Sequence, residues 1–138
     1  MFNGLIREIG EVINFDGKNL SIKAKYRPNL GDSIAVNGAC LSVIKIFDFG
    51  FCVEISSESS KNLAIQNLRN KVHIEPAMSL NQNIDGHLMQ GHIDFLGKIT
   101  KITKLQNGFD FFIKLPKEAM KFVAKKGSIA IDLSLIHI

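Results

Sequence analysis

Short runs of alternating apolar and polar residues recur along the chain and predict β-strands. The alternation is clearest in residues 20–26, 53–56 and 72–75, where apolar side chains occupy every second position. Period two places these side chains on one face of an extended chain, which is typical of a strand with one face buried. The pattern therefore predicts an all-β fold.

Turn-forming dipeptides separate the predicted strands. They are Asp16-Gly17, Asn37-Gly38, Asp85-Gly86 and Asn107-Gly108, and each supplies the positive φ that a tight turn needs. Residues 48–50 separate the apolar runs 41–46 and 51–53, as the turn of a hairpin does. Six or so short strands within about 85 residues predict a small closed barrel.

Two segments favour short helices instead. The first is residues 61–68, which follow the cap-rich run from Ser56 to Ser60. The second is residues 115–122, where Pro116 at the first helical position precedes good helix formers and Gly127 closes the helix.

The chain also repeats itself. Residues 4–12 reappear as residues 91–99 with both glycines aligned, at an offset of 87, and residues 31–37 are echoed by residues 126–132 at an offset of 95. Two matches in the same order indicate a tandem duplication. We therefore expect one barrel in residues 1–90 and the first part of a second barrel in residues 91–138.

The second copy is shorter than the first. Residues 33–90 span 58 positions, whereas the matching part from Ser128 to the last residue spans 11. About 47 residues would be needed to make the copies equal. An open half-barrel leaves strand edges unpaired, so we expect this half to be mobile or paired with another chain.

Composition narrows the class of protein. Of the 138 residues, 46% are hydrophobic and 22% charged, which excludes a collagen, a disordered tail and a disulfide miniprotein. No apolar run approaches the roughly 18 to 20 residues that cross a bilayer, and Arg7 and Glu8 stand where a signal peptide would be apolar. We expect a cytoplasmic protein without a membrane partner.

Charge and cysteine content add two expectations. The net charge is +4, but the 17 Lys and Arg residues are scattered and form no run that follows a phosphate backbone. We expect no nucleic-acid partner. The reducing cytoplasm favours two free thiols at Cys40 and Cys52 over a disulfide.

Three motifs resemble those of riboflavin synthases. They are the N-terminal run from Met1 to Ile6, the segment Asn37-Gly38-Ala39-Cys40-Leu41-Ser42-Val43, and the junction Gly86-His87-Leu88-Met89-Gln90-Gly91-His92-Ile93. In the family the second reads Asn-Gly-x-Cys-Leu-Thr-Val and the third Gly-His-Leu-x-x-Gly-His. The resemblance covers residues 1 to about 132, and the residues from Leu133 onward depart from the family pattern.

The resemblance implies two six-stranded Greek-key barrels, the second incomplete here, and a homotrimer assembled by a C-terminal helix. It implies neither a metal nor an organic cofactor. The family's transferase reaction, a step of riboflavin biosynthesis, passes a four-carbon unit between two molecules of 6,7-dimethyl-8-ribityllumazine. The products are riboflavin and 5-amino-6-ribitylamino-pyrimidinedione. Because two rings must be held together, we expect little activity from this chain alone.

The resemblance also assigns site residues. Catalytic candidates are Phe2, which would cover the ring, Ser33 and Cys40 as nucleophile or activating group, and His92 as the group that titrates near neutral pH. The substrate-binding candidates come from both copies of the repeat: Gly4, Leu5, Ile6, Cys40, Leu41, Ser42, Glu54, Ile55, Ser56, Ser57, Glu58, Ser59, Gly91, His92, Ile93 and Lys126.

These residues also have structural interpretations. Cys40 could be a small buried hydrophobe, Ser33 a turn hydroxyl, the run from Ser56 to Ser60 a helix cap, and Lys126 a solvated charge. Phe109, Phe111 and Phe112 are expected in the core rather than at a ligand. His87 and His92 lack the Cys or carboxylate partner that would complete a metal site.

Two other functions fit parts of the sequence. A non-catalytic lumazine- or flavin-binding protein of the same fold would keep the first ring pocket and lose the second. An oligonucleotide-binding barrel fits only the positive charge, because the chain lacks the aromatic and basic face that single strands require. We favour a riboflavin synthase, with the lumazine- or flavin-binding protein as the alternative.

Overall fold

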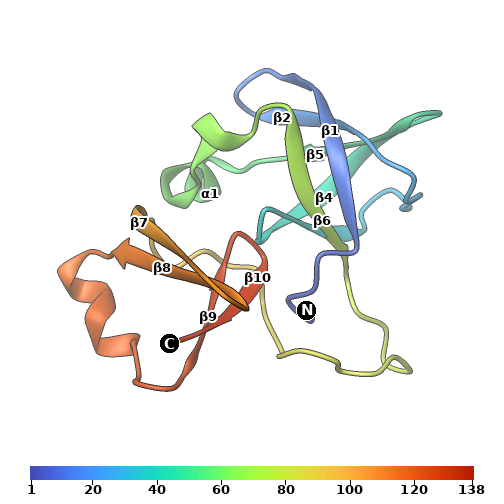
Figure 1. Ribbon diagram of the computed structural model, residues 1–138. Helices are drawn as coiled ribbons and strands as arrows, with labels where there is room; N and C mark the ends of the chain where they lie inside the picture. The colour runs from blue at the N-terminus through green and yellow to red at the C-terminus, as the bar shows by residue number, and fades with distance from the viewer.

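The computed structural model describes the backbone of residues 1–138 and every side chain except those of Glu58, Leu135 and His137. Six strands form a closed barrel in the first half of the chain, and residues 98–138 form two separate two-stranded sheets (Figure 1). The predicted all-β fold with one closed and one partly formed barrel is confirmed. Within the described residues, no helix has the length and apolar character needed to span a membrane.

The barrel is antiparallel throughout. Its strands are β1 (Glu8–Phe15), β2 (Asn19–Lys23), β3 (Ser33–Val36), β4 (Ala39–Phe47), β5 (Gly50–Glu54) and β6 (Lys71–Pro76). Their order around the barrel is β1-β2-β5-β4-β3-β6, and β6 closes the sheet by pairing with both β3 and β1. Each strand therefore has a hydrogen-bonded neighbour on both sides.

Tight turns set the register of the hairpins. Asn37 and Gly38 join β3 to β4 with φ values of 46° and 85°, the left-handed conformation that a two-residue hairpin turn requires. At the β1–β2 turn, the Asp16 carboxylate accepts hydrogen bonds from the backbone N–H groups of Asn19 (2.7 Å) and Lys18 (2.9 Å). These bonds, chiefly those from Asn19, lower the pKa of Asp16.

Alternate residues of the strands point into the barrel. Together with three residues outside the strands (Ala24, Ile55 and Leu68), they form a completely or almost completely buried cluster: Leu20, Ile22, Ile34, Val36, Ala39, Leu41, Val43, Phe51, Val53, Val72 and Ile74. Burial of a large apolar side chain stabilises a fold by about 1.5–3 kcal/mol. This core therefore holds the first half of the chain together.

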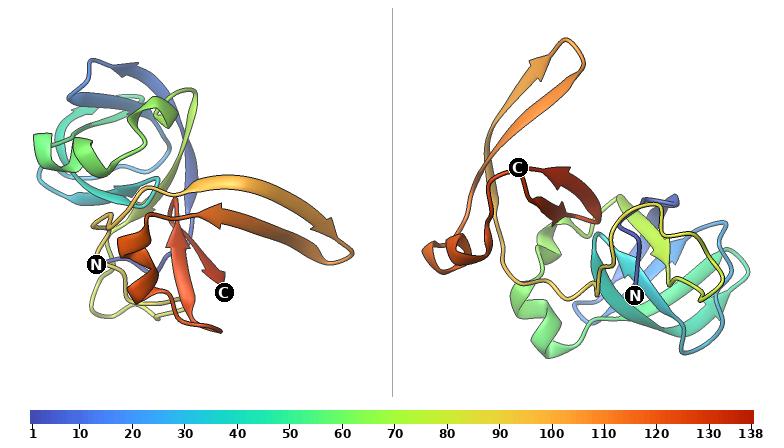
Figure 2. Two further views of the ribbon diagram at one scale, coloured as in Figure 1. Left: turned by 90° about the vertical axis from the view of Figure 1, so that its left-hand side faces the viewer. Right: turned by 90° about the horizontal axis from the view of Figure 1, so that it is seen from below.

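Residues 98–138 repeat the start of the barrel without closing it. β7 (Lys98–Leu105) pairs with β8 (Gly108–Lys114), the short 3-10 helix η2 (Lys117–Phe122) follows, and β9 (Ser128–Ile131) pairs with β10 (Ser134–His137). The β9–β10 hairpin repeats the register of β3 and β4 at an offset of 95, as the duplication predicts. The β7–β8 hairpin extends away from the barrel (Figure 2).

The three phenylalanines of β8 were expected in the core, and that expectation is wrong. Phe109, Phe111 and Phe112 are 57%, 41% and 51% exposed. The β7–β8 sheet has two strands and projects from the rest of the molecule (Figure 2). Apolar side chains on such a sheet remain in contact with solvent.

Helix boundaries also differ from the sequence-based expectation. α1 (Ser57–Asn62) begins before residue 61, because the Ser56 hydroxyl caps it by accepting a hydrogen bond from the Ser59 N–H at 3.0 Å. A separate 3-10 turn, η1 (Ile65–Asn67), covers part of the remaining expected helix. η2 is a 3-10 helix rather than an α-helix, and Pro116 precedes its first residue.

The predicted hairpin between β4 and β5 is confirmed, as are two free thiols at Cys40 and Cys52. Asp85 and Gly86, expected at a tight turn, lie instead in a bend of the long connection after β6. That connection leads to the candidate site.

Candidate functional site

The N-terminal segment (residues 1–7) lies against the junction segment (residues 83–91). The Phe2 N–H donates to the Met89 carbonyl at 2.8 Å, and the Met89 N–H donates back to the Phe2 carbonyl at 2.9 Å. The His87 N–H donates to the Asn3 carbonyl at 3.0 Å. Two parts of the chain almost ninety residues apart in sequence thus form an isolated antiparallel β-bridge.

These two segments cover the outside of the barrel at the β3–β4 hairpin. In β3 and β4 the core residues alternate with Ser33, Ala35, Cys40 and Ser42, so these four form the outer hairpin face. Ala35 lies opposite Cys40, and Ser33 lies opposite Ser42. Phe2 is completely buried, and it packs with Ala35, Cys40, Met89 and the buried Leu133 of the β9–β10 turn in a second apolar cluster outside the barrel.

Two glycines of the junction motif permit this close packing. A Cβ on Gly91 would lie 2.9 Å from the Cys40 Cβ and 3.0 Å from the Phe2 ring, and its φ is +79°. A Cβ on Gly86 would lie 2.1 Å from the Asn3 carbonyl oxygen. The Gly91 carbonyl also accepts a hydrogen bond from the Cys40 N–H at 2.7 Å. The motif thus brings Phe2 and Cys40, from distant parts of the chain, to one place.

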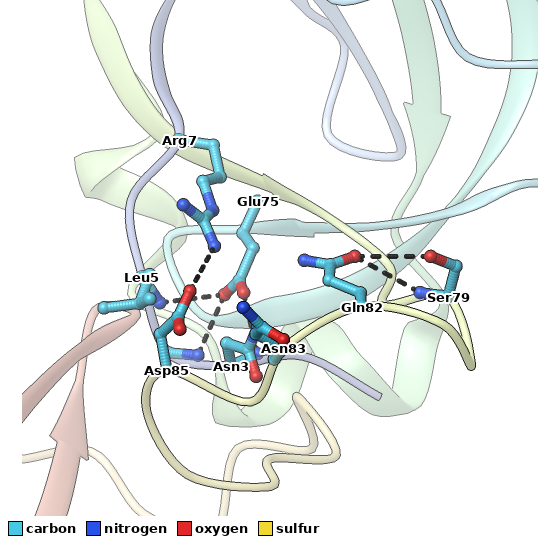
Figure 3. Close-up of polar contacts among 9 residues, drawn as sticks. Asn3, Leu5, Arg7, Glu75, Ser79, Gln82, Asn83 and Asp85 are labelled. Carbon is cyan, nitrogen blue, oxygen red and sulfur yellow. Dashed lines mark hydrogen bonds and ion pairs between the residues drawn. The ribbon is translucent and has the colours of Figure 1, made fainter.

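A buried carboxylate fixes the other side of this site. Glu75 in β6 is 2% exposed and accepts hydrogen bonds from three consecutive N–H groups, those of Asn3 (2.7 Å), Gly4 (3.0 Å) and Leu5 (3.2 Å) (Figure 3). Glu75 lies opposite Ala35 across the β3–β6 pairing. Glu75, Ala35 and Cys40 therefore form one row across three strands on the outside of the barrel.

Sequence reasoning did not single out Glu75. The alternation in residues 72–75 places its side chain on the outward face, where a carboxylate is ordinarily solvated. Glu75 is buried because the N-terminal segment covers this face. No periodicity within β6 predicts that cover.

The remaining candidates on the outer hairpin face and the junction differ in accessibility. Ser33 is half-buried and Ser42 is exposed, whereas Leu41 points into the barrel core. Leu5 is half-buried and Ile6 is exposed. His92 directly follows Gly91 and is exposed, and His87 is exposed at the other end of the motif. Ile93 packs its partly buried side chain against the barrel core.

The segment from Glu54 to Ser59 has structural roles in this fold. Glu54 forms an ion pair with Lys18 at 2.6 Å, and the hydrogen bond from that pair raises the pKa of Lys18. Ile55 belongs to the barrel core, Ser56 caps α1 and donates to the Ser59 hydroxyl at 2.9 Å, and Ser57 is exposed. The Glu58 side chain lies outside the described residues.

Lys126 has no described contact with this cluster. It is exposed in the turn before β9 with a φ of +63°, and the neighbouring Gly127 N–H closes the turn onto the Ala124 carbonyl at 2.9 Å. Among the side chains that the structure describes, no three His, Cys, Asp or Glu residues group as metal ligands. Two open depressions of about 380 and 360 Å³ flank β1, and neither is lined by Phe2, Cys40 or Gly91.

Comparison with known proteins places the chain in a family. The model of the lumazine binding domain matches residues 3–77, the range that holds the barrel. A riboflavin synthase of Mycobacterium bovis is 32% identical over 142 residues, which cover 96% of this chain and 71% of the relative. The chain belongs to the riboflavin synthase family.

A second relative and two solved structures are also similar to the chain. The riboflavin synthase of Actinobacillus pleuropneumoniae is 36% identical over 141 residues, and the chain spans 66% of that relative's length, just under two thirds. The crystal structure of LumP complexed with riboflavin has a TM-score of 0.83 at 19% identity, covering 100% of this chain and 80% of LumP. The structure of LumP complexed with 6,7-dimethyl-8-(1'-D-ribityl) lumazine has a TM-score of 0.81. At this identity the LumP structures support the fold.

Proposed function

We propose that this chain binds the ring of 6,7-dimethyl-8-ribityllumazine beside the outer hairpin face and supplies one ring site of a riboflavin synthase. The observation that carries the proposal is the convergence of Phe2, Cys40 and Gly91 at one place. They come from the N-terminal segment, β4 and the junction segment, the same three segments in which the sequence resembles riboflavin synthases.

The chemistry of the site fits this role. Cys40 and Met89 are the partly exposed members of the apolar cluster around the buried Phe2 and Ala35, and a flat ring can pack against them. The glycines Gly4 and Gly91 allow close approach of the backbone. The Cys40 thiol and the Ser33 and Ser42 hydroxyls share the outer hairpin face, where they can add to the ring or hydrogen-bond to it. The exposed His92 imidazole is the candidate base for the proton that leaves the C7 methyl.

Dismutation needs two such rings, stacked in opposite senses. The first barrel of this chain offers one site, and residues 98–138 form two separate hairpins rather than a second closed barrel. We therefore expect slow turnover from the 138-residue chain by itself. A second copy of the first barrel, or a completed second barrel as in the homotrimer implied by the family, would supply the other ring.

A second candidate is a lumazine- or flavin-binding protein without catalysis. The similarity to LumP, whose structures hold a lumazine, riboflavin or flavin mononucleotide, favours it. Both candidates share the ring site in the first barrel. They differ only in whether riboflavin is formed.

One experiment separates the two. The chain is incubated with 6,7-dimethyl-8-ribityllumazine, binding is followed by quenching of its fluorescence, and riboflavin is quantified with time. Formation of riboflavin that Cys40→Ala slows at least about tenfold, with Cys52→Ala as the matched control on β5, supports the synthase. Tight binding with no riboflavin supports the binding protein, and no binding refutes both.

A further inference from the structure

We propose that Glu75 is a positioning residue of the ring site, and this inference rests on the proposed function. Its carboxylate holds the backbone of residues 3–5 so that the Phe2 ring stays against Cys40 and Gly91. Glu75 itself does not touch the ring. Its part is to fix the segment on which the ring packs.

The hydrogen-bond geometry supports a dedicated anchor. One Glu75 oxygen accepts from Asn3 at 2.7 Å, and the other accepts from Gly4 and Leu5 at 3.0 and 3.2 Å. These partners lie 70 to 72 residues away in sequence. The carboxylate is 2% exposed, so water does not compete for the three bonds, and bonds to a charged acceptor are stronger than neutral ones.

The backbone of the N-terminal segment is shaped for this carboxylate. Gly4 has a φ of +75°, and a left-handed residue turns successive N–H groups toward one point, which creates an anion-binding concavity. A Cβ on Gly4 would also lie 2.9 Å from the Met89 sulfur. Glycine at this position therefore serves both the N–H cradle and the close approach of the junction segment.

The row across three strands links the anchor to the site. Glu75 lies opposite Ala35, Ala35 lies opposite Cys40, and neighbouring strands are about 4.8 Å apart. Phe2 lies directly before the three anchored residues and packs on Ala35. Without the carboxylate, the N–H groups of residues 3–5 lose their acceptor, which favours opening of the segment. Phe2 would leave Cys40 as the segment opens.

The test compares Glu75→Gln with Glu8→Gln in the full 138-residue chain. Glu8 is a matched control, because its carboxylate also accepts from two backbone N–H groups, those of Lys25 and Tyr26, away from Phe2. The first readout is amide hydrogen exchange at Asn3, Gly4 and Leu5. The second is riboflavin affinity from fluorescence quenching.

We expect Glu75→Gln to speed exchange of these three amides and to weaken riboflavin binding at least about tenfold. Glu8→Gln should change neither. Glu75→Asp, which keeps the charge on a shorter arm, should recover part of the affinity. If the three amides exchange faster in Glu75→Gln while riboflavin binds as in the wild type, the anchor exists but does not position the ring site, and the inference is wrong.

A second variant guards against a folding defect. If Glu75→Gln does not fold, Gly4→Ala disturbs the same cradle with the carboxylate intact, and it should also weaken binding. Undiminished affinity in Gly4→Ala would then overturn the inference. Failure of the wild-type chain to bind riboflavin or the lumazine overturns the proposed function itself, a result distinct from equal binding by wild type and variant.

Discussion

The first barrel and residues 98–138 start from similar sequence and reach different structures. In the barrel, each of six strands has two neighbours, and residues such as Ile22 and Phe51 are fully buried. In residues 98–138 the strands pair only as hairpins, and Phe112 and Ile102 stay about half exposed. Strand pattern alone therefore does not produce a core.

Closure makes the difference. β6 pairs with β1 and β3 and so joins the two ends of the first sheet. The β7–β8 and β9–β10 hairpins are separate sheets, and a lone two-stranded hairpin is at best marginally stable in water. The ring site proposed here lies on the closed half, on the side where the junction segment leaves the barrel.

Proteolysis should show the largest contrast between the halves. Local opening costs little free energy in a hairpin with few buried contacts and up to the global value in a closed core. We expect a nonspecific protease to cut first in the β7–β8 hairpin and to trim the chain to a product that ends near Gln90. Mass spectrometry of the products checks this, and early cuts inside β2 or β5 would reverse the comparison.

Matched phenylalanine truncations should separate the halves energetically. Phe51→Ala empties a fully buried position in the barrel and is expected to destabilise it by about 3–5 kcal/mol. Phe112→Ala removes a side chain that is 51% exposed, and we expect a change within about 0.5 kcal/mol. Urea unfolding midpoints at constant m measure both, and comparable losses would show that β8 is packed in solution.

Two glycines that each begin the second strand of a hairpin give a smaller contrast. A Cβ on Gly50, at the start of β5, would lie 2.0 Å from the Ile22 carbonyl oxygen, whereas a Cβ on Gly108, at the start of β8, meets no atom within 4 Å. Gly50→Ala should cost about 1–3 kcal/mol, and Gly108→Ala, which meets no atom but strains a backbone φ of +156°, about 1 kcal/mol from that strain alone. Thermal unfolding of the two variants is the measurement, and an equal loss would mean that β5 has room to shift.

The smallest expected effect concerns pH. The N–H groups of Asn19 and Lys18 lower the pKa of Asp16 below its ordinary value of 3.8 in the folded chain. A lowered pKa means that this stabilisation is present above the ordinary value and is lost as the pH falls through the folded one. Asp16→Asn should therefore flatten the acid side of the stability curve slightly. Thermal midpoints of both proteins across that range test it, and an unchanged slope would contradict it.

Much of the closed half could be predicted from sequence. The alternation in residues 20–26 and 72–75 and the Asn37-Gly38 turn correctly predict β2, β6 and the β3–β4 hairpin. The expected helix starts at residue 61, whereas α1 starts at Ser57. The sequence-based interpretation places the run from Ser56 to Ser60 before the helix, but Ser56 is itself the N-cap. Phe109, Phe111 and Phe112 are exposed because β7 and β8 form a sheet of only two strands. The local alternation of apolar and polar residues does not predict the size of the sheet.

The site could be predicted only in part. The resemblance pointed to Phe2, Cys40 and Gly91, which the fold brings together, and to Lys126, which lies in an exposed turn. Glu75 was missed because its burial comes from residues 70 positions earlier. Long-range cover of an outward-facing carboxylate leaves no periodic signal in either segment.

The most direct test of the account is the location of the bound ring on the full chain. Titration of isotopically labelled protein with riboflavin, followed by amide chemical shifts, should perturb Phe2 to Ile6, Ser33 to Ser42 and Gly91 to Ile93. The β7–β8 hairpin should not respond. Shifts confined to the depressions along β1, around Ile9 and Lys23, or to residues 98–122 would contradict a ring site at the Phe2 and Cys40 cluster.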